Sequence, residues 1–149
     1  MSCTRPNMGM NPPKHHWDLD DSRFIEAFET GSLSPSLFNH EAHLRLAYIY
    51  LKNFGEELAI EKCCNGICEF DQLHGDGTKF HKTLTVASVK AVHHFMRKSK
   101  SATFDDFIVE FPRLKISFKQ LLDQHYAFDL LNNAKAKSEY VAPDLIPFD

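Results

Sequence analysis

The chain has 149 residues, of which 43% are hydrophobic and 25% charged, and its formal net charge is −3 at pH 7. These values suit one folded domain. They exclude an intrinsically disordered chain and a nucleic-acid-binding protein that relies on a strongly basic surface. No apolar run approaches the ~18 residues that a membrane span needs, so we expect neither a membrane nor a nucleic-acid partner.

The first residues, MSCTRPNMGMNPPK, are rich in proline and asparagine and lack the apolar segment of a secretory signal. We therefore predict a flexible N-terminal arm over residues 1–14, a single helical domain over residues 15–149, and a cytoplasmic location. His15 and His16, next to this arm, are expected to lie in solvent.

The cysteines indicate a reduced protein. Cys63 and Cys64 are adjacent, which makes a poor disulfide, and the spacing of the four cysteines is not that of a zinc knuckle. Cys63 shares the apolar face of its segment and is expected to be a buried, small hydrophobic residue. Cys64 and Cys68 lie at the edge of that face, where a redox pair is the less favoured alternative.

Apolar residues recur with helical spacing through most of the domain, and no strand-like alternation persists beyond a few residues. Capping residues and glycines divide this pattern into segments. The predicted helices span residues 20–30, 39–53, 56–73, 80–98, 103–111 and 114–124. The sequence therefore predicts an all-α fold, a compact bundle of four to six helices.

The last segment, SEYVAPDLIPFD, contains two prolines and is predicted to be an extended tail. Its residues Val141, Leu145, Ile146 and Phe148 are too apolar to remain in solvent. We expect the tail to pack across the bundle.

Two histidines lie on the apolar face of the segment 39–53. Positions three apart lie about 60° from each other on a helix, so His40 and His43 share the face of Leu44 and Ala47. Neutral imidazoles that converge in this way are typical ligands of a divalent transition metal. The alternative is a pair of core histidines that hydrogen-bond to backbone or hydroxyl groups.

The segment 80–98 carries a polar seam, His81, Thr85 and Ser88, within its apolar face. Hydroxyl groups in such a seam can simply bond to the helix carbonyls. If consecutive hairpins connect the second, third and fourth helices, the second and fourth are parallel, and His81 then meets His40 and His43 at one end of the bundle.

Further candidates surround these three histidines. His74 is the first candidate for a fourth metal ligand and Asp71 another, although a histidine at a helix C-terminus can also act as a partner of the helix dipole. Thr83, Thr85 and His125 are predicted to contact a substrate. The expected cofactor is a divalent transition metal: Zn²⁺, or else Fe, Mn or Ni.

Several of these residues belong to blocks that resemble the motifs of a family of small, mostly bacterial, uncharacterised helical proteins. The family pattern is F-x-H-x-x-H-L-R-x-A, then K-Y-H-E-T-L-T, then V-x-P-D-L near the C-terminus. It is matched by Phe38, His40, His43, Leu44, Arg45 and Ala47, then Lys79, His81, Thr83, Leu84 and Thr85, then Val141, Pro143, Asp144 and Leu145.

The resemblance extends over most of the chain from about residue 17, but it depends on these short blocks. Phe80 and Lys82 depart from the pattern, which has tyrosine and glutamate at these positions. If that glutamate is a catalytic acid or base in the family, this chain lacks it. No activity is assigned to the family, so the resemblance points to His40, His43 and His81 without implying a reaction.

Two hypotheses of function follow. The first is a metal-binding helical protein, possibly a metal-dependent hydrolase, in which His40, His43 and His81 hold the ion and a bound water attacks a small-molecule substrate. The second is a non-catalytic module that binds a small molecule or a protein and has buried structural histidines.

Arg45 is expected to hold the tail through Asp144. The protein is expected to be a monomer or a homodimer.

Overall fold

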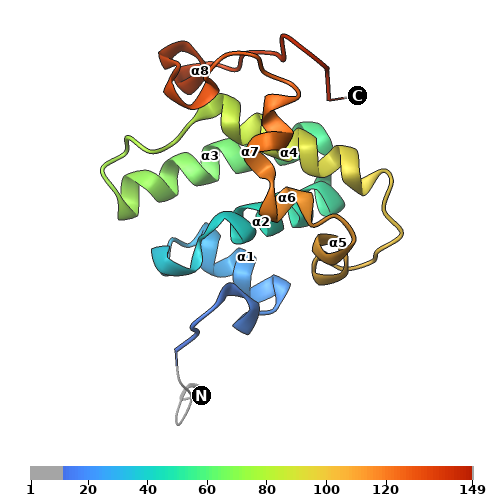
Figure 1. The fold of residues 1–149 in the computed structure, drawn as a ribbon. Coiled ribbons are helices and arrows are strands. Elements are labelled where there is room, and N and C mark those ends of the chain that lie inside the picture. The colour runs from blue at the N-terminus through green and yellow to red at the C-terminus, as the bar shows by residue number, and fades with distance from the viewer. Residues whose placement is uncertain (1–11, 149) are drawn as a thin grey trace, which may run out of the picture.

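The structure, a computed structural model, describes residues 12–148 and confirms the all-α prediction (Figure 1). This part of the chain contains eight α-helices and no strand. The helices are α1 (Asp21–Glu29), α2 (His40–Phe54), α3 (Glu56–His74), α4 (Lys82–Met96), α5 (Phe104–Glu110), α6 (Arg113–Ile116), α7 (Phe118–Asp123) and α8 (Ala134–Ser138). None of these helices is both long and apolar enough to cross a membrane. The predicted arm lies mostly outside the described residues.

Helices α2, α3 and α4 pack against one another and form the centre of the bundle. In Figure 1, α2 and α4 run in the same direction and α3 runs the opposite way. The first turns of α2 and α4 and the last turn of α3 therefore lie at the same end of the bundle. This arrangement is the up-down-up topology that the sequence analysis assumed.

Local signals set the ends of these helices. The Asn39 side chain accepts a hydrogen bond from the backbone N–H of Ala42 at 2.9 Å and so caps α2. Gly55, with a φ of 85°, separates α2 from α3 in a conformation that favours glycine. At the start of α4, Nδ1 of His81 accepts from the backbone N–H of Leu84 at 3.0 Å.

The predicted helix over residues 114–124 is wrong in one respect, because it divides into α6 and α7. The backbone leaves the helical conformation at Ser117, with φ −127° and ψ 37°. This break lets Leu114 on one side and Leu121 and Leu122 on the other enter the same core.

The C-terminal tail packs across the bundle as predicted. Thr83, which has no exposed surface, donates a hydrogen bond to the carbonyl of Glu139 at 2.6 Å and accepts one from the N–H of Val141 at 3.0 Å. Phe148 is buried. The expectation of burial is wrong for two other tail residues, because Leu145 is 51% exposed and Ile146 61% exposed.

The segment before α1 is held by Arg45, and two predictions are corrected here. The guanidinium of Arg45 donates to Asp21 at 2.8 Å and to the carbonyls of His16 and Leu19 at 2.7 and 2.8 Å. The expected pairing of Arg45 with Asp144 is therefore wrong: Asp144 instead accepts from the N–H of Ala127.

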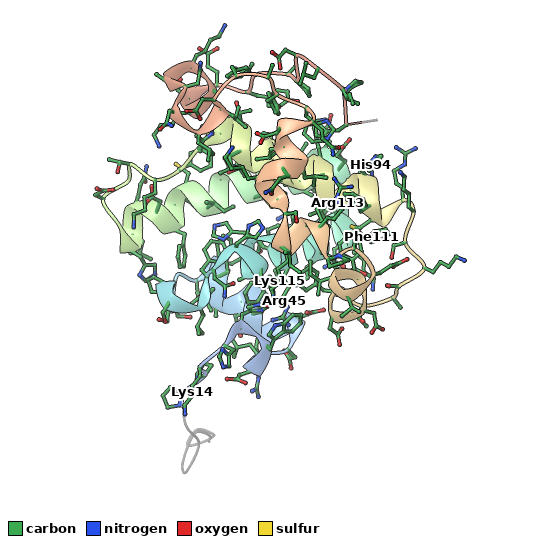
Figure 2. All side chains as sticks on the ribbon, in the orientation of Figure 1. Lys14, Arg45, His94, Phe111, Arg113 and Lys115 are labelled. Atoms are coloured by element: carbon green, nitrogen blue, oxygen red, sulfur yellow. The ribbon has the colours of Figure 1, made fainter. Side chains whose placement is uncertain are left out.

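The second correction concerns His16, which is 1% exposed rather than solvated. Its Nε2 donates to Glu41 at 2.8 Å, and Lys115 of α6 also reaches Glu41, at 2.8 Å. Figure 2 shows Arg45 and Lys115 close to each other beside this segment. Burial alone would raise the pKa of Glu41, but hydrogen bonds from Lys115, His16 and Trp17 outweigh it and lower that pKa.

Candidate functional site

A cavity of about 480 Å³ lies between α2, α3 and α4, with Phe118 of α7 on one wall. Its volume is in the range of pockets that bind small molecules. The apolar lining includes Phe38, Ala47, Ile67, Phe70, Phe80, Leu84 and Phe118. The polar lining includes His40, His43, His74, His81, Asp71, Thr85 and Ser88.

The cavity brings together most of the residues that the sequence analysis selected. All four candidate metal ligands, His40, His43, His74 and His81, line it, and so does Thr85. Two other candidates do not: Thr83 and His125 bind the tail instead. The Nδ1 atom of His125 donates to the carbonyl of Ile146 at 2.6 Å, and its ring stacks on Phe148.

His81 has a structural role. Its Nδ1 accepts the N–H of Leu84, so in the neutral ring the proton is on Nε2, which donates to the carbonyl of Leu130 at 3.0 Å. Burial lowers the pKa of His81, which favours this neutral form. Since both ring nitrogens are engaged, His81 cannot take the ligand role predicted for it in this conformation.

The other three histidines of the cavity share a different arrangement, in which one ring nitrogen meets a backbone carbonyl. Nε2 of His40 lies 2.9 Å from the carbonyl oxygen of Leu114. Nδ1 of His43 lies 2.8 Å from that of Asn39, and Nε2 of His74 lies 2.7 Å from that of Gly31. A carbonyl oxygen can only accept, so each of these nitrogens carries a proton.

Each of the three rings also packs against a phenylalanine. His43 stacks on Phe38 with ring centroids 3.8 Å apart. His40 contacts Phe118 at 4.9 Å, and His74 contacts Phe70 at 4.5 Å. The carbonyl and the aromatic contact together fix the orientation of each imidazole.

The second nitrogen of each of these rings is left with a lone pair in the neutral form. Within residues 12–148 no hydrogen-bond partner reaches Nδ1 of His40, Nε2 of His43 or Nδ1 of His74. For His43, burial is the main reason that its pKa is lowered, so the ring is neutral at pH 7. The cavity therefore presents fixed imidazole acceptors.

Two hydroxyl groups of the cavity wall bond to carbonyls of their own helix, which is the simpler of the two roles considered for the polar seam. Thr85 donates to the carbonyl of His81 at 2.8 Å, and Ser88 donates to that of Leu84 at 2.7 Å. Each hydroxyl proton is used, while the oxygen lone pairs remain available.

Asp71 organises the turn that precedes α4. Its Oδ2 accepts from the backbone N–H groups of Lys79 and Phe80 at 2.8 and 2.9 Å. Oδ1 has no hydrogen-bond partner within the described residues and is a further acceptor on the cavity wall. The ammonium group of Lys137 closes the same turn, because it donates to the carbonyls of Thr78 and Phe80.

The site does not assemble the predicted three-histidine metal centre. No group of three or more histidine, cysteine, aspartate or glutamate residues in the described part of the chain is placed to hold a metal ion. Cys63, which also lines the cavity, is 1% exposed, and burial raises the pKa of its thiol to about 12. The prediction that Cys63 is a buried hydrophobic residue is confirmed.

Sequence reasoning did not anticipate all the contributors to the cavity. Phe118 lies in the segment predicted as one helix over residues 114–124, and it follows the break of that helix at Ser117. The role of Phe70 as a stacking partner had one weak signal, because it lies four residues before His74 in α3. Phe38 lies five residues before His43 and outside α2, and no such signal pointed to it.

The buried histidines make stability dependent on pH. The pKa values of His16, His43 and His81 are lowered from 6.5, chiefly by burial, so the unfolded chain binds protons at these rings at a higher pH than the folded protein does. The free energy of unfolding is expected to decrease as pH falls below 6.5, by up to about 1.4 kcal/mol per ring and pH unit. Urea titrations at pH 7.5 and 5.5 measure this change, and equal stabilities at the two values would contradict it.

Comparison of the chain with protein-family models, with curated proteins and with solved structures found no match. The resemblance to the bacterial family therefore stays a prediction from its motifs.

Proposed function

We propose that the protein binds a small organic molecule in the cavity between α2, α3 and α4. The observation that carries this proposal is the arrangement of His40, His43 and His74. Each ring is held by a carbonyl and a phenylalanine while one nitrogen has no partner in the described chain. Fixed polar atoms in an otherwise apolar pocket are the usual means by which a ligand is oriented.

The cost of this arrangement supports a binding role. A cavity lowers stability because apolar side chains lose contacts, and polar atoms without partners in a partly buried site add to that cost. A leucine at His43 would avoid the second of these costs at that position. A ligand that fills the space and bonds to the imidazoles recovers them, and this recovery is what drives binding.

A divalent transition metal is the second candidate ligand. The specific observation in its favour is that His40, His43 and His74 each donate one N–H to a carbonyl, which is how metal-bound histidines are commonly oriented. This hypothesis requires the rings to approach one another more closely than they do, whereas an organic molecule can bridge them where they are.

Two measurements separate the candidates. Elemental analysis of tag-free protein tests the metal hypothesis, for which about one transition-metal ion per chain is expected. A set of small aromatic compounds, added to ¹⁵N-labelled protein, tests the organic-ligand hypothesis. We expect chemical-shift changes concentrated at Ala47, Ile67 and Leu84. If millimolar concentrations of these compounds cause no chemical-shift changes, or only changes scattered over the surface, the organic-ligand hypothesis is contradicted.

Filling the cavity gives an independent test. Ala47 lines the cavity, whereas the equally buried Ala91 of α4 does not. Ala47→Leu is expected to change the free energy of unfolding by less than about 1 kcal/mol, because the new side chain enters existing space, and to abolish compound binding. Ala91→Leu overpacks the core and should cost about 1–3 kcal/mol. Urea denaturation checks both values, and equal costs would contradict the cavity.

The cytoplasm is the location we propose. Cys63, Cys64 and Cys68 are all free thiols, as in a reducing compartment. A monomer or a homodimer is the proposed oligomeric state.

A further inference from the structure

The stronger side-chain hydrogen-bond donors of the cavity wall are mostly used already. The hydroxyl protons of Thr85 and Ser88 go to helix carbonyls, and the ring protons of the histidines go to Leu114, Asn39, Gly31 and Leu130. The side-chain amide of Asn39 and the ammonium of Lys79 are the polar donors left, and both residues are exposed. A molecule inside the cavity therefore meets few donors.

Acceptors are plentiful in the same space. The free nitrogens of His40, His43 and His74 offer three lone pairs, and Oδ1 of Asp71 offers a negatively charged one. The oxygens of Thr85 and Ser88 can each accept as well. The residues that carry these atoms line the cavity from three helices, α2, α3 and α4.

This excess of hydrogen-bond acceptors over donors favours some classes of ligand over others. An anion would place its charge against lone pairs and the Asp71 carboxylate, with no buried cation to compensate it. A ligand whose polar atoms only accept would leave the imidazoles unbonded after displacing water from them. A ligand that donates satisfies them, and a flat aromatic body suits a wall that contains Phe38, Phe70 and Phe118.

We infer that the cavity selects an aromatic or heteroaromatic compound that carries N–H or O–H donors and no negative charge. The inference rests on the proposed function and specifies its ligand class. The imidazole of His43 is the central acceptor, because His43 is half-buried whereas His40 and His74 are exposed.

Indole and benzofuran provide a matched pair of probes. They have nearly the same shape, but indole has an N–H donor where benzofuran has an ether oxygen. Their dissociation constants can be measured by chemical-shift titration of ¹⁵N-labelled protein, with benzoate as the anionic probe. Long-range ¹H–¹⁵N spectra of the histidine rings report whether Nε2 of His43 receives the hydrogen bond.

The expected result is that indole binds about three- to tenfold more tightly than benzofuran, as one net hydrogen bond predicts, and that benzoate binds more weakly than both. In His43→Leu the indole preference should fall to about onefold while both neutral probes still bind. His40→Leu is a second variant in case the first does not fold.

The outcomes separate this inference from the proposed function. If indole and benzofuran bind in the cavity equally well, or benzoate binds most tightly, the donor selectivity is overturned while the binding function stands. If none of the probes shifts resonances of the cavity lining, both are overturned.

Discussion

Replacing Arg45 with methionine is expected to lower the free energy of unfolding by about 3 kcal/mol, because two backbone carbonyls lose hydrogen bonds from a charged donor. The substitution removes the donors to Asp21 and to the carbonyls of His16 and Leu19. Asp21 is exposed and can be rehydrated, but the two carbonyls lose their charged partner. For a chain of this length the melting temperature should fall by on the order of 10 °C.

Lys115→Met is the matched control. Lys115 also forms an ion pair in this region, with Glu41 at 2.8 Å, but its side chain is 53% exposed. Its removal should cost about 1 kcal/mol or less, because Lys115 is half-exposed and Glu41 keeps its hydrogen bonds from His16 and Trp17. Thermal unfolding followed by circular dichroism measures both variants. If the two variants lose the same stability, the N-terminal segment is not anchored by Arg45.

His81→Leu is expected to lower stability and keep the preference for indole, whereas His43→Leu is expected to keep stability and lose the preference for indole over benzofuran. His81→Leu removes the cap of α4 and leaves the N–H of Leu84 without a partner, whereas the carbonyl of Leu130 still accepts the N–H of Asn133, and the change should cost about 1–2 kcal/mol. Indole binding should persist. His43→Leu should change stability by less than about 1 kcal/mol, because the carbonyl of Asn39 still accepts the backbone N–H of His43.

Urea denaturation and chemical-shift titration of the same two proteins provide the measurement. Asn is a useful third residue at position 81, because His81→Asn keeps a side chain that can cap the helix and should recover about 1 kcal/mol relative to leucine. Loss of indole binding in a folded His81→Asn protein would return His81 to the binding site. A large destabilisation by His43→Leu would make His43 a structural residue instead.

The fold was largely predictable because its signals are local. Asn39 and Thr103 cap their helices through their side chains, and Gly55 separates α2 from α3 with a backbone conformation that favours glycine. The break at Ser117 was not predictable, because the apolar pattern continues through it. The break brings Leu114 and Leu121 into the same core, and this requirement of the folded shape leaves no mark in the local sequence.

The site was predictable in its members and not in its chemistry. Helical periodicity places His40, His43 and His81 at one end of the bundle, and they do line one cavity. It cannot indicate what each ring bonds to. The carbonyl that holds His40 lies 74 residues along the chain, and the one that holds His81 lies 49 residues along. Because of where these partners lie, both ring nitrogens of His81 are hydrogen-bonded, whereas one ring nitrogen of His40 has no partner within the described residues.

The residues that hold the cavity wall in place lie far along the chain from the histidines of α2, and this has a consequence for protein synthesis. Residues 130–141 supply the carbonyl for His81, the ammonium over the turn at Thr78 and the backbone partners of Thr83. A ribosome has therefore added residues 130–141 before these contacts of the cavity wall can form. The histidines of α2 are displayed earlier, on a nascent bundle that is still open. A compound present during translation therefore meets these histidines before the turn at Thr78 and the start of α4 are fastened.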